Sequence, residues 1–286
     1  MKAAPFRYAS PSSVAEAVAL LASDEGAKPI SGGQSLMPMM AFRLAAPTLL
    51  VDLRKIPELD RIAIDANGVR LGARVRWRDI LSDERLATAH PLLRNAISHV
   101  AHYQVRNRGT VGGSLAHADP AAEMPGIAAT VGAEITVVGA AGTRIVAAKD
   151  FFVGPLQTVL DAGELIVEVA LPAWRAGRRW AFEEFARRRG DFALAGVALH
   201  YDVDANGRAG NAHFGAIGAT SAPRRLTEAE AALNGQVVDA STIDAVGRAV
   251  GVAVDPFDDL HASAAYRRSL VQALAERALA RAAAQP

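Results

Sequence analysis

The sequence predicts an α+β protein built from an N-terminal domain to about residue 175 and a smaller C-terminal domain of antiparallel sheet plus helices. Three observations lead to this fold class. The chain has 286 residues, which is long for one compact unit. Helical and strand-like patterns follow one another without a repeat of fixed period. Pro, Gly and Arg cluster in PAWRAGRRW, residues 172–180, which predicts a boundary there.

The first fifty residues predict a helix between short strands. Residues 13–23, SVAEAVALLAS, place apolar side chains on one face of a helix, and the serines before Val14 are typical helix caps. AKPI, residues 27–30, is expected to be a strand that leads directly into SGGQS. PTLLVDLRKI, residues 47–56, is a short apolar run typical of a buried strand.

The middle of the chain predicts two hairpins around a helical region. Asn67-Gly68 separates two alternating runs and is a hairpin turn signal. Residues 77–107 are expected to be helical in two pieces, broken before Pro91. A second hairpin is predicted across Gly139 to Gly142, and ELIVEVALP, residues 164–172, predicts one more strand.

Beyond the boundary, strands precede helices, which favours a sheet covered by helices. The expected strands are residues 180–188, 192–204 and 210–219, and the expected helices are residues 227–235, 241–254 and 263–282.

Composition excludes several classes of function. The formal net charge is +1 and no block of like charge exceeds three residues, so no nucleic-acid footprint or polybasic anchor is visible. The chain has no cysteine, which excludes disulfides, a thiolate nucleophile and iron–sulfur clusters ligated by its own cysteines. No uncharged apolar run is long enough for a membrane span, and Glu16 interrupts the N-terminal apolar stretch. We expect a cytoplasmic protein.

Two short glycine motifs, both expected to be loops, carry the chemistry. ISGGQS, residues 30–35, follows a strand, and TVGGS, residues 110–114, lies in NRGTVGGSLAHADPAAEMP. Neither has the spacing of a dinucleotide-binding G-x-G-x-x-G turn or of a P-loop. Paired glycines allow consecutive backbone N–H groups to converge on an anion. Two such motifs with flanking hydroxyls and no basic residue inside suggest a ligand with more than one phosphate, held mainly by backbone amides.

SGGQSLMPMMAFRL, residues 31–44, together with QVRNRGTVGGSLAHADPAAEMP, residues 104–125, resembles the FAD-binding (medium) subunit of the molybdenum hydroxylases, of carbon monoxide dehydrogenase and xanthine dehydrogenase type. ELIVEVALP, FARRRGDFALAGVAL and AYRRSLVQALAERAL also fall where that family has counterparts. The resemblance implies a vanillyl-alcohol oxidase (PCMH)-type FAD-binding domain over residues 1–175, with subdomains of about 1–55 and 56–175. A C-terminal domain of the flavin subunit would cover residues 176–286.

The resemblance also implies cofactor contacts residue by residue. Glu123 matches a carboxylate that bonds FAD hydroxyls, Ile166 falls where a backbone contact to the adenine end is expected, and Phe192 lies beside the isoalloxazine ring in some members. The residues implied to line the FAD pyrophosphate and ribityl chain are Ile30, Ser31, Gly32, Gly33, Gln34, Ser35, Leu36, Thr110, Val111, Gly112, Gly113 and Ser114.

Three positions depart from the family pattern. Ser114 stands where Asn is common, and Gln34 stands where several relatives have His. Glu183 and Glu184 lie where a lysine near the flavin is often found, and the sequence leaves open whether Arg187 or Arg188 replaces that charge.

By the same resemblance the chain is an electron-transfer subunit without a catalytic residue or metal site of its own. Partners are implied: a small subunit with two [2Fe–2S] clusters and a large subunit with the molybdenum cofactor, in a heterotrimer or a dimer of heterotrimers. Electrons would pass from the clusters through FAD to an external acceptor. The sequence names neither the substrate nor that acceptor.

Two alternatives stay open at this point. One is a free-standing FAD-dependent oxidase or reductase of the same fold. The other is a metal-dependent hydrolase that uses His117, Asp119 and Glu123, since imidazole and carboxylates are the usual parts of such a site. No strong metal-binding spacing such as H-E-x-x-H supports the second.

Overall fold

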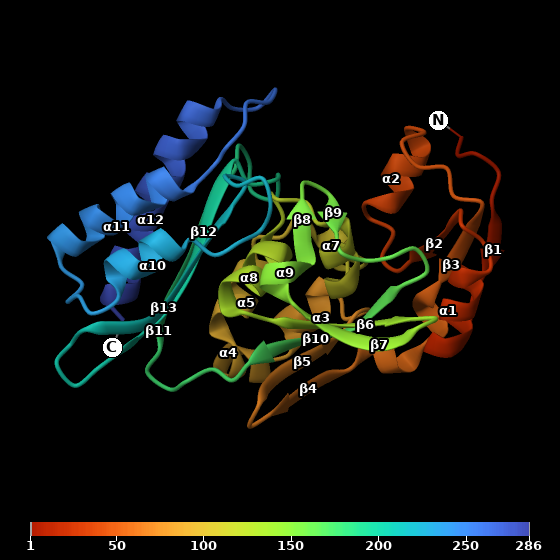
Figure 1. Cartoon of the computed structure of the whole chain (residues 1–286), viewed down its shortest axis with the longest axis horizontal. Coiled ribbons are helices and arrows are strands. Elements are labelled where there is room, and N and C mark those ends of the chain that lie inside the picture. Colours follow the sequence, from red (N-terminus) through yellow and green to blue (C-terminus); the bar gives the residue numbers. More distant parts are fainter. Residues whose placement is uncertain (1, 286) are drawn as a thin grey trace.

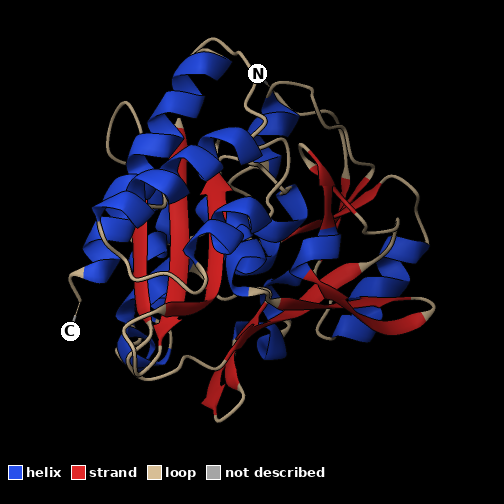
Figure 2. Ribbon diagram, turned by 60° about the vertical axis from the view of Figure 1, so that its left-hand side comes forward, coloured by secondary structure: helices blue, strands red, loops and turns tan. Residues whose placement is uncertain are grey.

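The computed structural model describes residues 2–285 and has the predicted mixed architecture of helices and sheets. Figures 1 and 2 show three main sheets side by side: a small N-terminal sheet, a central sheet under several helices, and a C-terminal sheet covered by long helices.

The N-terminal sheet is parallel and has the order β1-β3-β2. Helix α1 (Val14–Ala22) begins at Ser13, whose side chain accepts a hydrogen bond from the Glu16 amide, and it buries its apolar face against this sheet. The predicted helix and both predicted strands are confirmed, and α2 (Leu36–Ala41) was not foreseen. The strands are β1 (Arg7–Ala9), β2 (Ala27–Ile30) and β3 (Leu49–Asp52).

The central sheet is antiparallel, with the order β4-β5-β10-β6-β7, and both predicted hairpins are confirmed. Asn67-Gly68 turns β4 into β5, and the second hairpin joins β6 to β7 across Gly139 to Gly142. The strands are β4 (Ile62–Asp65), β5 (Gly68–Gly72), β6 (Glu134–Gly139), β7 (Gly142–Ala147) and β10 (Leu165–Pro172).

The helices over this sheet differ from the prediction. Residues 77–107 form four short helices instead of two pieces, because His90 and Asp83 end or cap individual turns in addition to the break at Pro91. TVGGS is not a loop, since Thr110 is the N-cap of α7. The helices are α3 (Trp77–Ser82), α4 (Arg85–Ala89), α5 (Pro91–Ile97), α6 (Tyr103–Arg106), α7 (Val111–His117), α8 (Glu123–Val131) and α9 (Ala148–Phe151); β8 (Phe152–Gly154) and β9 (Gln157–Thr158) form a small ribbon.

The C-terminal sheet, of order β11-β12-β13, is antiparallel and carries its helices on one side (Figure 1). Its apolar core joins Leu199 and Phe214 of the sheet to Val250 and Leu274 of the helices. The three predicted strands and three predicted helices are confirmed. They are β11 (Arg179–Phe185), β12 (Ala195–Val203), β13 (Ala209–Ile217), α10 (Thr227–Leu233), α11 (Ala240–Ala253) and α12 (Ala264–Ala283).

The other face of the C-terminal sheet packs against α5 and α8 of the N-terminal part. Gly126 of α8 lies against Ile217, where an added Cβ would come within 2.5 Å of its side chain. The Gly218 amide donates to the Pro120 carbonyl at 2.8 Å and ties the end of β13 to the segment before α8. This junction therefore brings residues 118–123 next to the C-terminal sheet.

None of the helices described within residues 2–285 combines the length and apolar character needed to cross a membrane.

Candidate functional site

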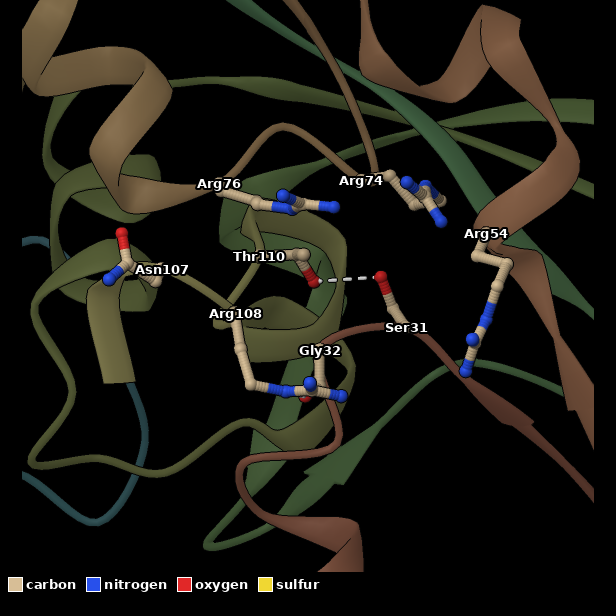
Figure 3. A pocket seen from close by; sticks show the side chains of 8 residues that line it. All are labelled: Ser31, Gly32, Arg54, Arg74, Arg76, Asn107, Arg108 and Thr110. Atoms are coloured by element: carbon tan, nitrogen blue, oxygen red, sulfur yellow. Dashed lines mark hydrogen bonds between the residues drawn. The ribbon is translucent and has the colours of Figure 1, made fainter. Parts of the chain in front are cut away.

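The two glycine motifs meet at one cavity of about 220 Å³ (Figure 3). Thr110 Oγ1 donates to Ser31 Oγ at 3.0 Å and joins them directly. A Cβ at Gly32 would overlap the carbonyl oxygen of Arg108, so glycine is required there for the two segments to approach each other. The structure thus brings together residues separated by nearly eighty positions in the chain.

The first motif presents open backbone donors. Gly33 has a φ of +71°, in the left-handed region that glycine adopts without strain. Within residues 2–285, no protein acceptor is recorded for the backbone N–H groups of residues 32–35. The Gln34 side-chain amide donates a hydrogen bond to the Gly32 carbonyl at 3.2 Å, and this bond stabilises the turn. Consecutive free N–H groups before a helix form a concave anion-binding feature.

The second motif is built differently from the expected loop. The Val111 amide donates to Val75 O at 3.0 Å, and the Gly112 amide donates to Ala73 O at 2.8 Å. The Gly113 amide has only a long bond of 3.3 Å to Thr110 Oγ1. Two of the amides expected to face a ligand are therefore already paired within the protein, and Gly113 is the exposed one of the glycine pair.

Arginine side chains complete the cavity, and the two glycine motifs alone do not predict them. Arg54 pairs with Asp52 at 2.6 Å, and the buried Arg74 makes two 3.0 Å bonds to Asp60. Within residues 2–285 no carboxylate lies within ion-pair distance of Arg76 or Arg108. Their two uncompensated charges match the two negative charges of a pyrophosphate diester.

A weak sequence signal for these arginines existed. Arg74 and Arg76 alternate in GARVRW directly after β5, and Arg108 comes just before TVGGS. Alternation places both side chains on one side of an extended segment. The cavity to which they point depends on the tertiary fold, which a motif search does not reveal.

The remaining predicted contacts lie on other elements. Glu123 begins α8 at the junction with the C-terminal sheet, and Phe192 is 69% exposed on the loop between β11 and β12. The Ala193 carbonyl at the end of this loop approaches Gly218, which is bonded to Pro120, so the Phe192 loop lies beside the segment that leads to Glu123. Ile166 is buried in β10 and pairs with Val137, so its side chain belongs to the core.

The carboxyl of Glu123 sits in a poorly solvated place opposite Glu184 of β11. Burial, and after it the negative charge of the nearby Glu184, together raise the pKa of Glu123 to about 8. Burial also raises the pKa of Glu184 to about 7. Glu183, in contrast, faces α12 and pairs with Arg281 at 3.0 Å. Of the two glutamates at the family's lysine position, Glu184 is therefore the one that faces the junction.

The structure does not support a metal centre built on His117, Asp119 and Glu123. Among the described residues, no group of three or more His, Cys, Asp or Glu side chains is gathered as a metal ion requires. Asp119 Oδ1 accepts from the Ala121 amide at 2.9 Å, which is a local turn contact. These residues shape the segment between α7 and α8.

Two family models together match nearly the whole chain. Residues 4–174 match the FAD binding domain in molybdopterin dehydrogenase, and residues 180–282 match the CO dehydrogenase flavoprotein C-terminal domain.

Relatives and solved structures agree with these models. The chain is 40% identical over 285 residues to the nicotine 6-hydroxylase medium subunit of Paenarthrobacter nicotinovorans, with 100% of each chain covered. It superposes on a chain of quinoline 2-oxidoreductase from Pseudomonas putida 86 with a TM-score of 0.94 and 40% identity, covering 99% of this chain and 98% of that one. For reconstituted CO dehydrogenase from Oligotropha carboxidovorans the TM-score is 0.97 at 33% identity, with 100% of each chain covered.

Proposed function

The chain belongs to the family of FAD-binding medium subunits of the molybdenum hydroxylases, and from this premise we propose that it binds FAD in the cavity of Figure 3 and transfers electrons from a partner subunit to an external acceptor. When bound, FAD supplies the redox chemistry, and the protein binds it, orients it and sets its surroundings.

One observation carries the proposal: the turn with the unpaired backbone N–H groups reaches the cavity at Ser31 and Gly32, and the same cavity is lined by the guanidinium-bearing Arg76 and Arg108. The N–H groups of residues 32–35 are available to phosphate oxygens, and Arg76 and Arg108 supply the positive charge. This donor set fits a pyrophosphate, because charge-assisted hydrogen bonds from planar guanidinium groups suit phosphate oxygens. Thr110 and Ser31 add hydroxyl groups at the meeting point of the two segments.

The other predicted cofactor contacts extend the proposed site in both directions from the cavity. We assign Glu123 to FAD hydroxyls and Phe192 to the ring end, in agreement with their positions on neighbouring segments at the junction. Ile166 is assigned a backbone contact at the adenine end. Of Ile30 to Leu36 and Thr110 to Ser114, the exposed or half-buried members are able to touch a ligand, and so is Thr110, which is buried but lines the cavity. Gly112 and Val111 act by packing.

Partners follow from the relatives, which are subunits of multi-subunit molybdenum hydroxylases. The proposed partners are a small [2Fe–2S] subunit and a large molybdenum-cofactor subunit, in a heterotrimer or its dimer. The domain limits 1–175 and 176–286, with subdomains near residue 55, and a cytoplasmic location remain predictions. A free-standing flavin oxidase is the alternative, and it predicts that the purified chain alone oxidises an organic substrate.

FAD affinity of arginine variants tests the proposal. Arg76→Gln with Arg108→Gln removes both uncompensated charges and leaves the paired Arg54 and Arg74 in place. Each charged hydrogen bond contributes about 1.5–3 kcal/mol, so the FAD dissociation constant is expected to rise at least about a hundredfold. Arg61→Gln, an exposed arginine without a recorded side-chain partner within residues 2–285, is the matched control. Unchanged affinity in the double variant would contradict the assignment.

A further inference from the structure

A second cavity, of about 280 Å³, lies where the end of α5 meets β11 and the loop that follows it. Its walls include Ser98 and His99 from the α5 side and Glu184, Arg188 and Arg189 from the other. None of these residues lines the cavity of Figure 3. The second cavity therefore lies at the junction of the N-terminal part with the C-terminal sheet.

The fixed charge of this cavity is positive. Within residues 2–285, neither Arg188 nor Arg189 makes an ion pair with a carboxylate. Burial lowers the pKa of His99, and the positive charge of Arg189 lowers it further, so the imidazole is neutral at neutral pH. Glu184 is the carboxyl in the wall, and burial raises its pKa to about 7, which leaves much of it uncharged. Two guanidinium groups thus face the cavity without a full counter-charge.

The loop that carries the arginines is held in place. Gly190 has a φ of +90°, and a Cβ there would come within 2.8 Å of the Ala101 carbonyl oxygen. The Asp191 amide donates to Arg188 O at 3.1 Å, and the Leu194 amide donates to Phe185 O at 2.9 Å. The loop backbone is therefore organised before any ligand binds, which reduces the entropy lost on binding.

The position of the cavity relates it to electron transfer. Phe192, the residue predicted to lie beside the flavin ring, is on the same loop two residues after Gly190. A molecule held by Arg188 and Arg189 would be next to the segment assigned to the ring end of the cofactor. A positively charged cleft also attracts negatively charged molecules and raises their local concentration.

We propose that this second cavity binds a small anionic electron acceptor and positions it for reoxidation of the flavin. The proposal rests on the FAD binding proposed above. With FAD bound, the reduced cofactor would supply two electrons and one proton, so that an acceptor held by Arg188 and Arg189 would receive the electrons and solvent would take up the proton. Arg188 and Arg189 act by binding the acceptor and take no proton.

Reoxidation of the reduced, FAD-loaded full chain by two oxidants tests this role. Ferricyanide is a small anion, and two ferricyanide ions accept one electron each. 1,4-Benzoquinone is uncharged and accepts two electrons with two protons, one from the flavin and one from solvent. Stopped-flow absorbance of the flavin is followed against the concentration of each oxidant, for the wild type, for Arg188→Gln with Arg189→Gln, and for the control Arg61→Gln.

We expect the second-order rate constant with ferricyanide to fall about tenfold or more in the double variant, since electrostatic steering changes such rates by about 10–1,000-fold. The rate with benzoquinone should stay within about twofold of the wild type, and Arg61→Gln should change neither. Equal rates with ferricyanide, or equal slowing with both oxidants, would overturn the proposal. A double variant that no longer holds FAD would also overturn it, because the two arginines would then belong to the cofactor site. A wild-type chain that never holds FAD would overturn the proposed function itself.

Discussion

Single residues at the cavity of Figure 3 show that a Gly-Gly pair plays a different structural role in each of the two motifs. In SGGQS the glycines let the backbone turn and let two chain segments touch, as the left-handed φ of Gly33 and the close approach of Gly32 to Arg108 show. In TVGGS, Gly112 is buried against Ala73 and Gly113 faces outward. Only one glycine of the second pair is thus placed to meet a ligand.

Alanine substitutions should separate these two roles. At Gly112 a new Cβ would lie 2.6 Å from the Ala73 Cβ, so Gly112→Ala is expected to lower the free energy of unfolding by about 1–3 kcal/mol. At Gly113 the nearest atom is Thr110 Oγ1 at 2.8 Å, so Gly113→Ala should mainly disturb the hydroxyl that joins the motifs and weaken FAD binding. Urea unfolding and FAD titration measure the two effects. If Gly112→Ala mainly weakened FAD binding and Gly113→Ala mainly lowered the free energy of unfolding, the roles assigned to the two glycines would be contradicted.

The junction carboxyl Glu184 makes a separate prediction about pH. Its pKa in the folded chain is about 7, against an ordinary value of 4.5. Between these values the folded state holds a proton that the unfolded state has lost, so stability decreases as pH rises through this window. In FAD-free protein, Glu184→Gln should make the decrease in the free energy of unfolding with rising pH less steep, as measured by urea unfolding across that pH range. Glu58→Gln, at an exposed site, is the control, and an unaltered slope in Glu184→Gln would exclude a desolvated carboxyl.

At the scale of elements, helix α7 is the part on which the cavity depends. Thr110 caps it, accepts from the Gly113 amide and bonds Ser31 of the other motif. The same side chain therefore starts a helix and holds two segments together.

Thr110→Val should keep the shape of this residue and remove its hydroxyl. Loss of an N-cap costs about 1 kcal/mol, and loss of the Ser31 bond should loosen the approach of the two motifs. We expect lower thermal stability together with weaker FAD binding. Thr110→Ser retains the hydroxyl and should restore most of both; if it behaves like Thr110→Val, the methyl group and not the hydroxyl is what matters.

Most elements could be predicted from the sequence because local signals specified them. Asn67-Gly68 and Gly139 to Gly142 determine their hairpins, and the C-terminal strands show alternating or apolar runs. The helices over the central sheet were predicted less well, because several short turns are capped by residues such as His90 with no strong sequence signature. The paired glycines of TVGGS are poor helix formers, so the sequence predicts a loop where the structure has helix α7.

The candidate site was predictable only where the chain carries a contiguous motif. SGGQS and TVGGS were recognised, and the structure does place them together. The fold places three arginines beside these motifs: Arg54, Arg74 and Arg76. Their positions along the chain do not predict that they line the same cavity. The same holds for the cavity at Arg188 and Arg189, which needs α5 and β11 to meet.

At the scale of the whole molecule, the junction between its two parts contains buried imidazole rings. The ring centroid of His90, at the start of α5, lies 4.8 Å from that of Trp174. The His200 ring centroid lies 5.4 Å from that of Trp174 and 4.4 Å from that of His213. Burial lowers the pKa of His90 to about 3 and that of His200 to about 2. Both are neutral in the folded chain, so the junction is expected to be sensitive to acid.

Acid unfolding measures this sensitivity. Below the ordinary histidine pKa of 6.5, His200 is protonated in the unfolded chain but stays neutral in the folded chain. The free energy of unfolding therefore decreases as the pH falls below 6.5. His200→Gln should reduce the slope by up to about 1.4 kcal/mol per pH unit, the contribution of one proton. His261→Gln, at an exposed position, should leave the slope unchanged. Equal slopes in the wild type and His200→Gln would show that His200 does not titrate on unfolding.

The central claim, that this chain is the flavin-binding electron carrier of its assembly, is tested most directly by the visible spectrum of the purified full chain. We expect flavin absorption bands, stoichiometric release of FAD on heating, and bleaching of those bands on reduction. A folded protein that stays colourless and takes up no FAD when the cofactor is added in excess would contradict it.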